Sequence, residues 1–247
     1  MIDDDRGVSE ILGFVLIFAL VTSMVAVVFT VGFGGLQAAQ EAEQVNNVER
    51  AFDVLDDNLK DLYQRDNFDR SELTRATEIK IAGGSVSLEE EIYITIEQGT
   101  ENFTYRPRPL AYADDSDSQI VYEAGAVIRM DDDAGLMLNE PSYIIDSDRS
   151  LLQLVNLRER GDRDEIGRVG TAHIVAEYSR SSIVTYDSSE PVNITVESPR
   201  AIAWKRYFES QERGTVEYDA GNDTVVYSFE SAETVIVETR IGIRLTN

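Results

Sequence analysis

The chain has 247 residues with 46 acidic and 22 basic side chains, so its formal net charge at pH 7 is -24. Such a surface repels phosphate backbones, which argues against nucleic acid as a partner. Hydrophobic residues make up 43%, enough for a buried core, and the absence of cysteine excludes disulfides, thiolate metal ligands and cysteine nucleophiles.

The acidic residues are spread along the whole chain, and only Lys60, Lys80 and Lys205 are lysine. Scattered acid of this kind indicates a general surface adaptation rather than one acidic binding site. Acidic, lysine-poor chains resemble proteins of halophilic archaea. We therefore expect the fold to weaken by self-repulsion at low salt and to gain stability as salt screens the charge.

The first expected element is an apolar run over residues 11–36 that contains no charged side chain. It exceeds the roughly 20 residues that a helix needs to cross a bilayer. A secretory signal has an apolar run of roughly 7 to 15 residues followed by a small-residue cleavage site, and this run is longer and lacks that site. The run predicts a retained transmembrane helix, and a plain N-terminal anchor is one form of it.

A short motif, Arg6-Gly7-Val8-Ser9-Glu10, precedes the run, which begins with Ile11-Leu12-Gly13. This junction resembles the processing site of archaeal type IV prepilins, in particular haloarchaeal pilin-like proteins. The resemblance covers only the N-terminal part of the chain. It implies that a membrane-bound prepilin peptidase cuts between Gly7 and Val8 and that the apolar helix stays on the mature protein.

Glu10 departs from the family patterns, because it is the third residue after the implied cut. Bacterial pilins have their glutamate at the fifth place, where this chain has Leu12, and many haloarchaeal pilins have proline at the third. If Glu10 keeps the bacterial role, its carboxylate pairs with the freed amine of Val8 on a neighbouring subunit. The alternative is an interfacial carboxylate favoured by the dipole at the helix N-terminus.

Orientation follows from the few basic residues near the apolar run. Arg6 precedes the run, and the next basic residue is Arg50. The positive-inside rule then places the N-terminus in the cytoplasm and the rest of the chain outside the cell.

Beyond the run, the sequence becomes polar but still favours helix. Apolar side chains recur at alternating intervals of three and four residues, which is the spacing of one helix face. This seam consists of Val45, Val48, Phe52, Leu55, Leu59 and Leu62. Either the protein's own sheet or a neighbouring subunit must cover it.

The remaining sequence predicts a mostly antiparallel sheet or sandwich, so that the fold class is α+β. Segments 77–82, 85–88 and 93–97 read as a meander with a tight turn at Gly83-Gly84. Later strands are expected at 119–130, 172–178, 183–186, 192–197, 215–218, 224–229 and 234–245. One helix interrupts them, with Ser198 as its N-cap, Pro199 at its first position and Gly214 after its end.

The expected organisation is a leader over residues 1–7, a transmembrane and stem helix over 8–64, a linker over 65–76 and an extracellular head over 77–247. Three Asn-x-Thr sequons lie on the expected head, at Asn102, Asn193 and Asn222. On an extracellular domain they are candidate glycosylation sites, although Asn193 falls within an expected strand.

Catalytic and cofactor motifs are missing from the sequence. His173 is the only histidine and lies in an apolar, strand-like run, so we expect it to be a packed or surface residue. Carboxylates cluster at 114–117, 131–133 and 146–148 without the spacing of an EF-hand loop, which favours solvated loop charge over a metal site. Trp204 is expected in the core. We predict no catalytic residues, no cofactor and no enzymatic activity.

These patterns predict a structural subunit, major or minor, of an archaeal type IV pilus-like filament that is held in the membrane before assembly. Its expected partners are the prepilin peptidase, membrane lipid and other pilin-like subunits. The alternative is a membrane-anchored extracellular binding or adhesion module that never polymerises. An anchored ectoenzyme lacks a catalytic constellation.

Overall fold

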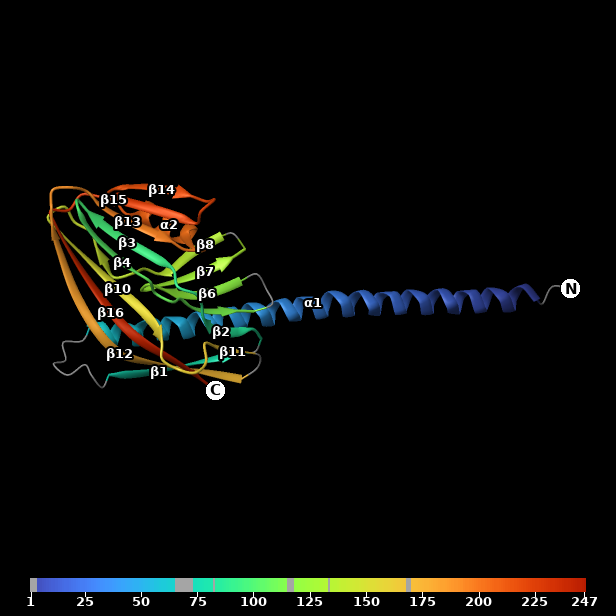
Figure 1. Ribbon diagram of the computed structural model, residues 1–247. Helices are drawn as coiled ribbons and strands as arrows, with labels where there is room; N and C mark the ends of the chain where they lie inside the picture. Colours follow the sequence, from blue (N-terminus) through green and yellow to red (C-terminus); the bar gives the residue numbers. More distant parts are fainter. Residues whose placement is uncertain (1–3, 65–72, 82, 115–117, 133, 168–169) are drawn as a thin grey trace. The chain divides into compact units, whose positions relative to one another are not determined.

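The computed structural model describes residues 4–64, 73–81, 83–114, 118–132, 134–167 and 170–247. The chain divides into two compact units, Met1–Asn46 and Asn47–Asn247. An N-terminal apolar helix and a mostly antiparallel sheet domain confirm the expected α+β class (Figure 1).

Helix α1 (Asp4–Gln64) contributes to both units. In the first unit it contains Ile11–Val31, a stretch of 21 residues with a mean hydropathy of 2.8, none of which is buried. By length and composition this stretch is able to cross a membrane. In the second unit, the part of α1 from residue 47 to 64, here called the stem, packs within the sheet domain.

The described strands of the second unit form three sheets. The central sheet has the order β1 (Thr74–Ile81), β12 (Gly170–Asp187), β16 (Glu233–Thr246), β10 (Arg149–Glu159) and β9 (Tyr143–Ile144). The second sheet has the order β11 (Glu165–Gly167), β2 (Ser85–Leu88), β5 (Leu110–Ala113), β6 (Ser118–Glu123), β7 (Ala126–Asp131) and β8 (Ala134–Asn139). The third has the order β14 (Thr215–Asp219), β15 (Thr224–Phe229), β13 (Val192–Glu197), β3 (Tyr93–Gln98) and β4 (Glu101–Tyr105).

The central sheet is shared by two hydrophobic cores that lie on its opposite faces. Val155, Leu157 and Ile241 point into the first core, which also contains the stem. Leu152 and Ile236 point into the second core, which contains the third sheet and α2 (Ala201–Ser210). We call the face toward the first core the stem face and the face toward the second core the far face. Side chains alternate between the two faces along each strand, so one sheet contributes to both cores. Each core lies near a different end of the strands.

A buried polar network fixes the start of α2. The Glu123 carboxylate accepts hydrogen bonds from Arg200 Nε at 2.6 Å and from Trp204 Nε1 at 2.7 Å. Ser198 Oγ also donates to it, at 2.8 Å. The expected N-cap at Ser198 is therefore wrong, because the helix begins after Arg200. The Ser198 hydroxyl donates to the Glu123 carboxylate and accepts a hydrogen bond from the Arg200 backbone N–H.

The expected meander is also wrong, because β1, β2 and β3 belong to three different sheets. Ile79 and Val86 both enter the first core, but from two different walls of it. Gly84, at φ 81°, turns the chain between the walls, and a Cβ there would lie 2.2 Å from the Ala113 carbonyl oxygen. The glycine pair thus makes a corner where a hairpin was expected.

Three boundaries need correction. Strand β1 begins at Thr74, inside the linker that was expected over 65–76, and residues 65–72 of that linker lie outside the described residues. The segment expected as one strand over 119–130 is the hairpin of β6 and β7, turned at Ala124 and Gly125 with φ 53° and 99°. Positive φ at both positions is the two-residue turn that matches strand twist. Conversely, 172–178 and 183–186 are one strand, β12, with a register shift between Tyr178 and Arg180. The chain absorbs the extra residue as a bulge and keeps pairing with β16.

Strand β10 was not expected at all, although it lies inside the central sheet. It pairs with β16 in parallel, whereas every other pairing among the described strands is antiparallel. The short strands β4, β5, β8, β9 and β11 were missed as well.

Candidate functional site

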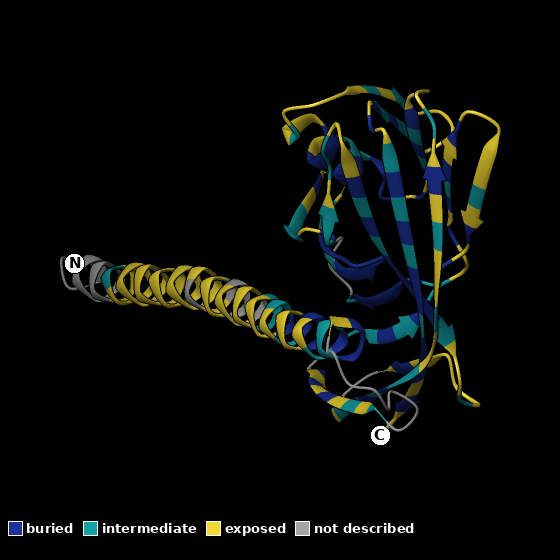
Figure 2. Ribbon diagram, turned by 90° about the vertical axis from the view of Figure 1, so that its left-hand side faces the viewer, coloured by how far each residue is buried: buried dark blue, intermediate teal, exposed yellow. Residues whose placement is uncertain are grey.

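The described side chains of the apolar helix in the first unit form an almost fully exposed hydrophobic surface (Figure 2). The exposed fraction is 70% for Phe14 and 71% for Val28, and the large apolar side chains between them are comparably open. Two stacked aromatic pairs lie along the helix, Phe14 with Phe18 and Phe29 with Phe33. In water this surface carries a large hydrophobic cost, so it needs lipid or protein around it.

The residues of the implied processing site, Gly7, Val8 and Glu10, lie in the first turns of α1, which begins at Asp4. Their side chains lie outside the described part of the structure, so the ion pair expected for Glu10 stays a prediction.

The seam residues of the second unit lie in the first core. Val48, Phe52, Leu55, Leu59 and Leu62 are at most 1% exposed, so the protein's own sheets cover this part of the seam. Val45 belongs to the first unit and is partly exposed.

Polar contacts also hold the stem in the second unit. Glu49 pairs with Arg129 of β7 at 2.7 Å. Asp56 is fully buried and accepts hydrogen bonds from Lys60 at 2.7 Å and from Asn139 of β8 at 2.8 Å. Burial raises the pKa of Asp56, although these two hydrogen bonds oppose the rise.

The three sequons differ in accessibility. Asn102 is exposed on the edge strand β4, and Asn222 is exposed in the turn between β14 and β15. Asn193 lies in β13 between two neighbouring strands, is partly buried and accepts a hydrogen bond from Ser228 at 2.6 Å. Asn102 and Asn222 are therefore the geometrically accessible candidates.

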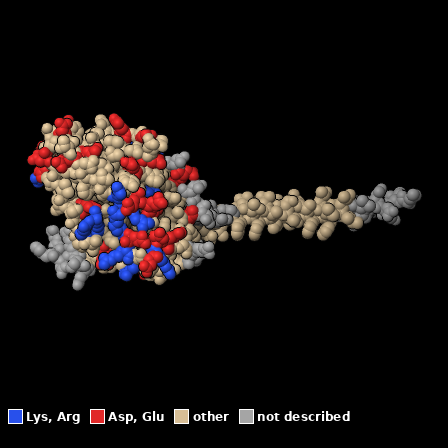
Figure 3. Space-filling model, in the orientation of Figure 1, with Lys and Arg blue, Asp and Glu red and all other residues tan. Residues whose placement is uncertain are grey.

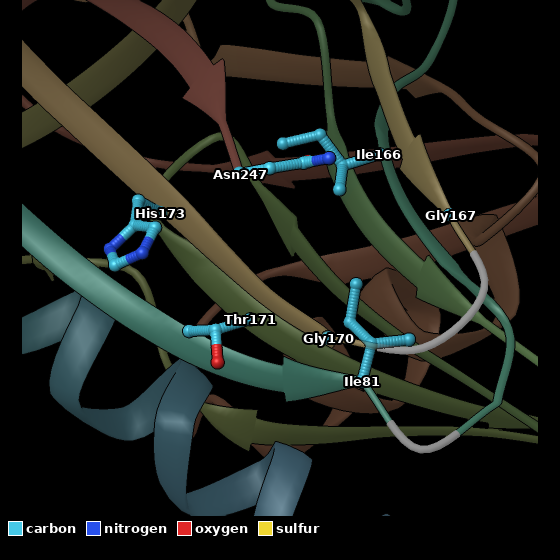
Figure 4. Close-up of a pocket in the computed structure, with 7 residues that line it drawn as sticks. All are labelled: Ile81, Ile166, Gly167, Gly170, Thr171, His173 and Asn247. Atoms are coloured by element: carbon cyan, nitrogen blue, oxygen red, sulfur yellow. The ribbon is translucent and has the colours of Figure 1, made fainter.

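His173 lines a hollow of about 240 Å³ at one end of the central sheet. Figure 4 shows its seven lining residues, from β1, β11 and β12 and from the residue after β16. The His173 ring is 39% exposed, with Nδ1 3.4 Å from the Glu78 carboxylate. Thr171 supplies the only side-chain hydroxyl among the lining residues.

The acidic clusters that the sequence singled out are held by protein contacts where the structure describes them. Asp131 accepts from Arg129 at 2.7 Å and from Ser118 at 2.6 Å, which hold its pKa below its ordinary value. Asp146 caps the backbone N–H of Asp148 at 3.0 Å. Residues 115–117 and 133 lie outside the described residues. Within the described ranges, no group of three or more His, Asp or Glu side chains could hold a metal ion.

Because each core covers only part of the central sheet, each face also has an open part. On the stem face, Ile144 is 61% exposed and Ile183 is 70% exposed. The register places Ile144 beside Leu151, Leu151 beside Val235, and Ile183 beside Val237. These five aliphatic residues form an open apolar patch across β9, β10, β16 and β12.

The described structure thus combines a candidate membrane-spanning helix with a two-core β-rich domain. Residues 6–244 match DUF7289, a family of unknown function, and the chain belongs to that family. The match includes both the apolar helix and the β-rich domain, so both parts belong to the region that defines the family. A search of curated proteins gives no match, and a search of solved structures gives none.

Proposed function

We propose that this protein is a subunit, major or minor, of an archaeal type IV pilus-like surface filament in a salt-adapted cell. The observation that carries the proposal is the unburied helix over Ile11–Val31, preceded directly by Arg6-Gly7-Val8-Ser9-Glu10. A prepilin peptidase removes residues 1–7, and the mature chain waits in the membrane with its N-terminus on the cytoplasmic side. The β-rich unit is extracellular and carries glycans on Asn102 and Asn222.

The physical step is the transfer of the apolar helix from lipid into a bundle of like helices. Lipid and helix bundle both shield the same apolar side chains, so assembly exchanges one apolar surrounding for another instead of exposing them to water. The stem needs no such partner, because the second unit already covers Phe52 and its seam neighbours. Helix contacts between subunits are therefore expected along residues 11–36.

Cysteine crosslinking of the full chain in native membranes tests this proposal, since the chain has no cysteine of its own. Two cysteines per chain, at Val15 with Ile17 or at Leu16 with Phe18, face nearly opposite sides of the helix, so disulfides between neighbouring chains can extend beyond a dimer. We expect ladders of disulfide-linked chains from at least one pair. Ser189→Cys, in an exposed turn of the β-rich unit, is the control for random collision. Monomers, or nothing larger than dimers, from both pairs would contradict polymerisation.

A second candidate function is a membrane-anchored extracellular binding module that does not polymerise. The apolar patch around Ile144 and Ile183 favours it, because exposed aliphatic clusters on a sheet face are typical of binding surfaces. Monomers in the helix crosslinking experiment, together with loss of cell-surface adhesion in Ile183→Asp, would support this candidate over the filament subunit.

A further inference from the structure

The open part of the far face of the central sheet carries a hollow rich in arginine. Its volume is about 530 Å³, and its lining residues are Arg158, Glu159, Arg160, Ser179, Arg180, Arg240 and Gly242. Four of the chain's 22 basic residues thus line one hollow on a protein of net charge -24. Figure 3 shows basic atoms gathered on this side of the β-rich unit, next to acidic ones.

Strand register brings these arginines together. Arg180 of β12 lies directly opposite Arg240 of β16, and Arg158 of β10 lies opposite Gly242 of β16. Gly242 leaves room for the Arg160 side chain, whose Cδ lies 2.9 Å from where a Cβ at Gly242 would be. The bulge before Arg180 places this residue on the far face of the central sheet, directly opposite Arg240.

Three of the four arginines already have a carboxylate partner. Arg158 pairs with Glu91, Arg160 pairs with Glu177 at 2.6 Å, and Arg240 Nε donates to Glu238 at 2.9 Å. Burial opposes ionisation of Glu238, but hydrogen bonds from Arg240, Asn156 and Ser182 outweigh it and lower the pKa of this carboxyl group. Glu238 is therefore a carboxylate at neutral pH, and it neutralises Arg240.

Arg180 is different. It is exposed, and no hydrogen-bond or ion-pair partner is found for it among the described residues. Like charges directly opposite each other on neighbouring strands destabilise a sheet. A chain with twice as many acidic as basic residues has many carboxylates with which to pair Arg180, yet none of those described does so.

From this geometry we infer that the arginine hollow binds side-chain carboxylates of a second copy of this chain, with Arg180 as the anchoring residue. Charge complementarity favours this occupant, because the surface of another copy is strongly acidic. The inference rests on the proposed function in that filament assembly brings the β-rich units of neighbouring copies together.

Guanidinium groups suit this task in molar salt. Long-range attraction is screened there within about 3 Å, but a bidentate arginine–carboxylate pair acts at contact distance and keeps its directional hydrogen bonds. A basic hollow on one copy and an acidic segment on the next form a heterologous contact. Such contacts repeat along a helical assembly, whereas a two-fold contact closes a dimer.

Photocrosslinking from the hollow tests the inference on the full chain in native membranes. Ser179→Cys, at the bulge beside Arg180, carries one epitope tag and is labelled with a benzophenone maleimide, and a copy with the natural Ser179 and a second epitope tag is co-expressed. We expect crosslinks that carry both tags, from position 179 to a segment rich in Asp or Glu. Arg180→Glu should reduce their yield about tenfold, as for losing one charge-assisted hydrogen bond.

Arg213→Glu is the matched control, because Arg213 is exposed, lies outside the hollow and is 3.8 Å from its partner Asp146. It should leave the yield unchanged. Crosslinks to lipid, to other proteins or within one copy only, or a yield that Arg180→Glu does not lower, would overturn the inference. The disulfide crosslinking of the helix is a separate test. Disulfide ladders without photocrosslinks from position 179 would reject only the proposed role of the arginine hollow. Photocrosslinks between copies without disulfide ladders would reject only the filament proposal.

Discussion

At the residue scale, the second unit depends on a few buried charged groups that join distant parts of the chain. Glu123 ends β6, yet its carboxylate holds Ser198, Arg200 and Trp204. Arg200 is only 5% exposed and also pairs with Glu89 at 2.8 Å. Buried charges of this kind are tolerated because each one is matched by partners of opposite charge, so removing a partner leaves a buried charge less compensated.

Replacing Glu123 with glutamine should lower the free energy of unfolding by about 3 kcal/mol, because the buried Arg200 then faces a neutral amide and keeps only Glu89 as a charged partner. Urea unfolding of the full chain in detergent measures this change. Glu89→Gln is the control: its carboxylate is 29% exposed, so the loss should stay near 1 kcal/mol. A loss below 1 kcal/mol for Glu123→Gln would show that the network contributes little.

Asp56 gives a pH dependence of defined sign. Burial raises its pKa in the folded state above the ordinary value of 3.8, so folding favours the protonated form. The resulting stability is present below the unfolded pKa and is lost as the pH rises through the folded pKa. Asp56→Asn should remove this loss. Urea unfolding of both proteins between pH 3.5 and neutral pH measures this difference. If the free energy of unfolding depended on pH equally in the two proteins, the account would be contradicted.

At the scale of elements, sequence patterns predicted the residues of some strands better than their partners. Segments 85–88, 192–197 and 224–229 coincide with β2, β13 and β15, because alternating burial marks a strand with one buried face. The turn at Ala124 and Gly125 was missed because alanine rarely adopts positive φ. Strand β10 was missed because residues 154–157 are all buried, which hides the alternation.

The stem offers a direct comparison of two faces of one helix. Phe52 is fully buried in the first core, whereas Val54 is 53% exposed. Phe52→Ala should lower the free energy of unfolding by about 3–5 kcal/mol through lost burial and a cavity. Val54→Ala should change it by less than about 0.5 kcal/mol. Equal effects in urea unfolding would mean that the stem does not belong to the folded β-rich unit.

At the scale of the whole molecule, neither the parallel pairing of β10 with β16 nor the sharing of one sheet by two cores was predictable here. Alternation indicates that a face is buried, but not against which element. The apolar helix was predictable because its signal is continuous and local. The arginine hollow was not, because Arg158, Arg180 and Arg240 are far apart in sequence and meet only through strand register.

The net charge of -24 predicts a strong dependence of folding on salt. Between low salt and molar potassium chloride, the melting temperature of the full chain should rise by roughly 10 °C, which corresponds to a few kcal/mol at this size. Circular dichroism follows the transition. Sucrose at equal osmolality is the control for solute exclusion, and a flat salt response would reject the salt-adapted surface.

The central claim is that the apolar helix stays on the mature protein after a short leader is removed. Mass spectrometry of the N-terminal peptide, from protein extracted from native membranes, tests it most directly. The account predicts that the mature chain begins at Val8 and still contains the helix over Ile11–Val31. A mature chain that begins at Met1 or Ile2, or one that has lost the helix, would contradict it.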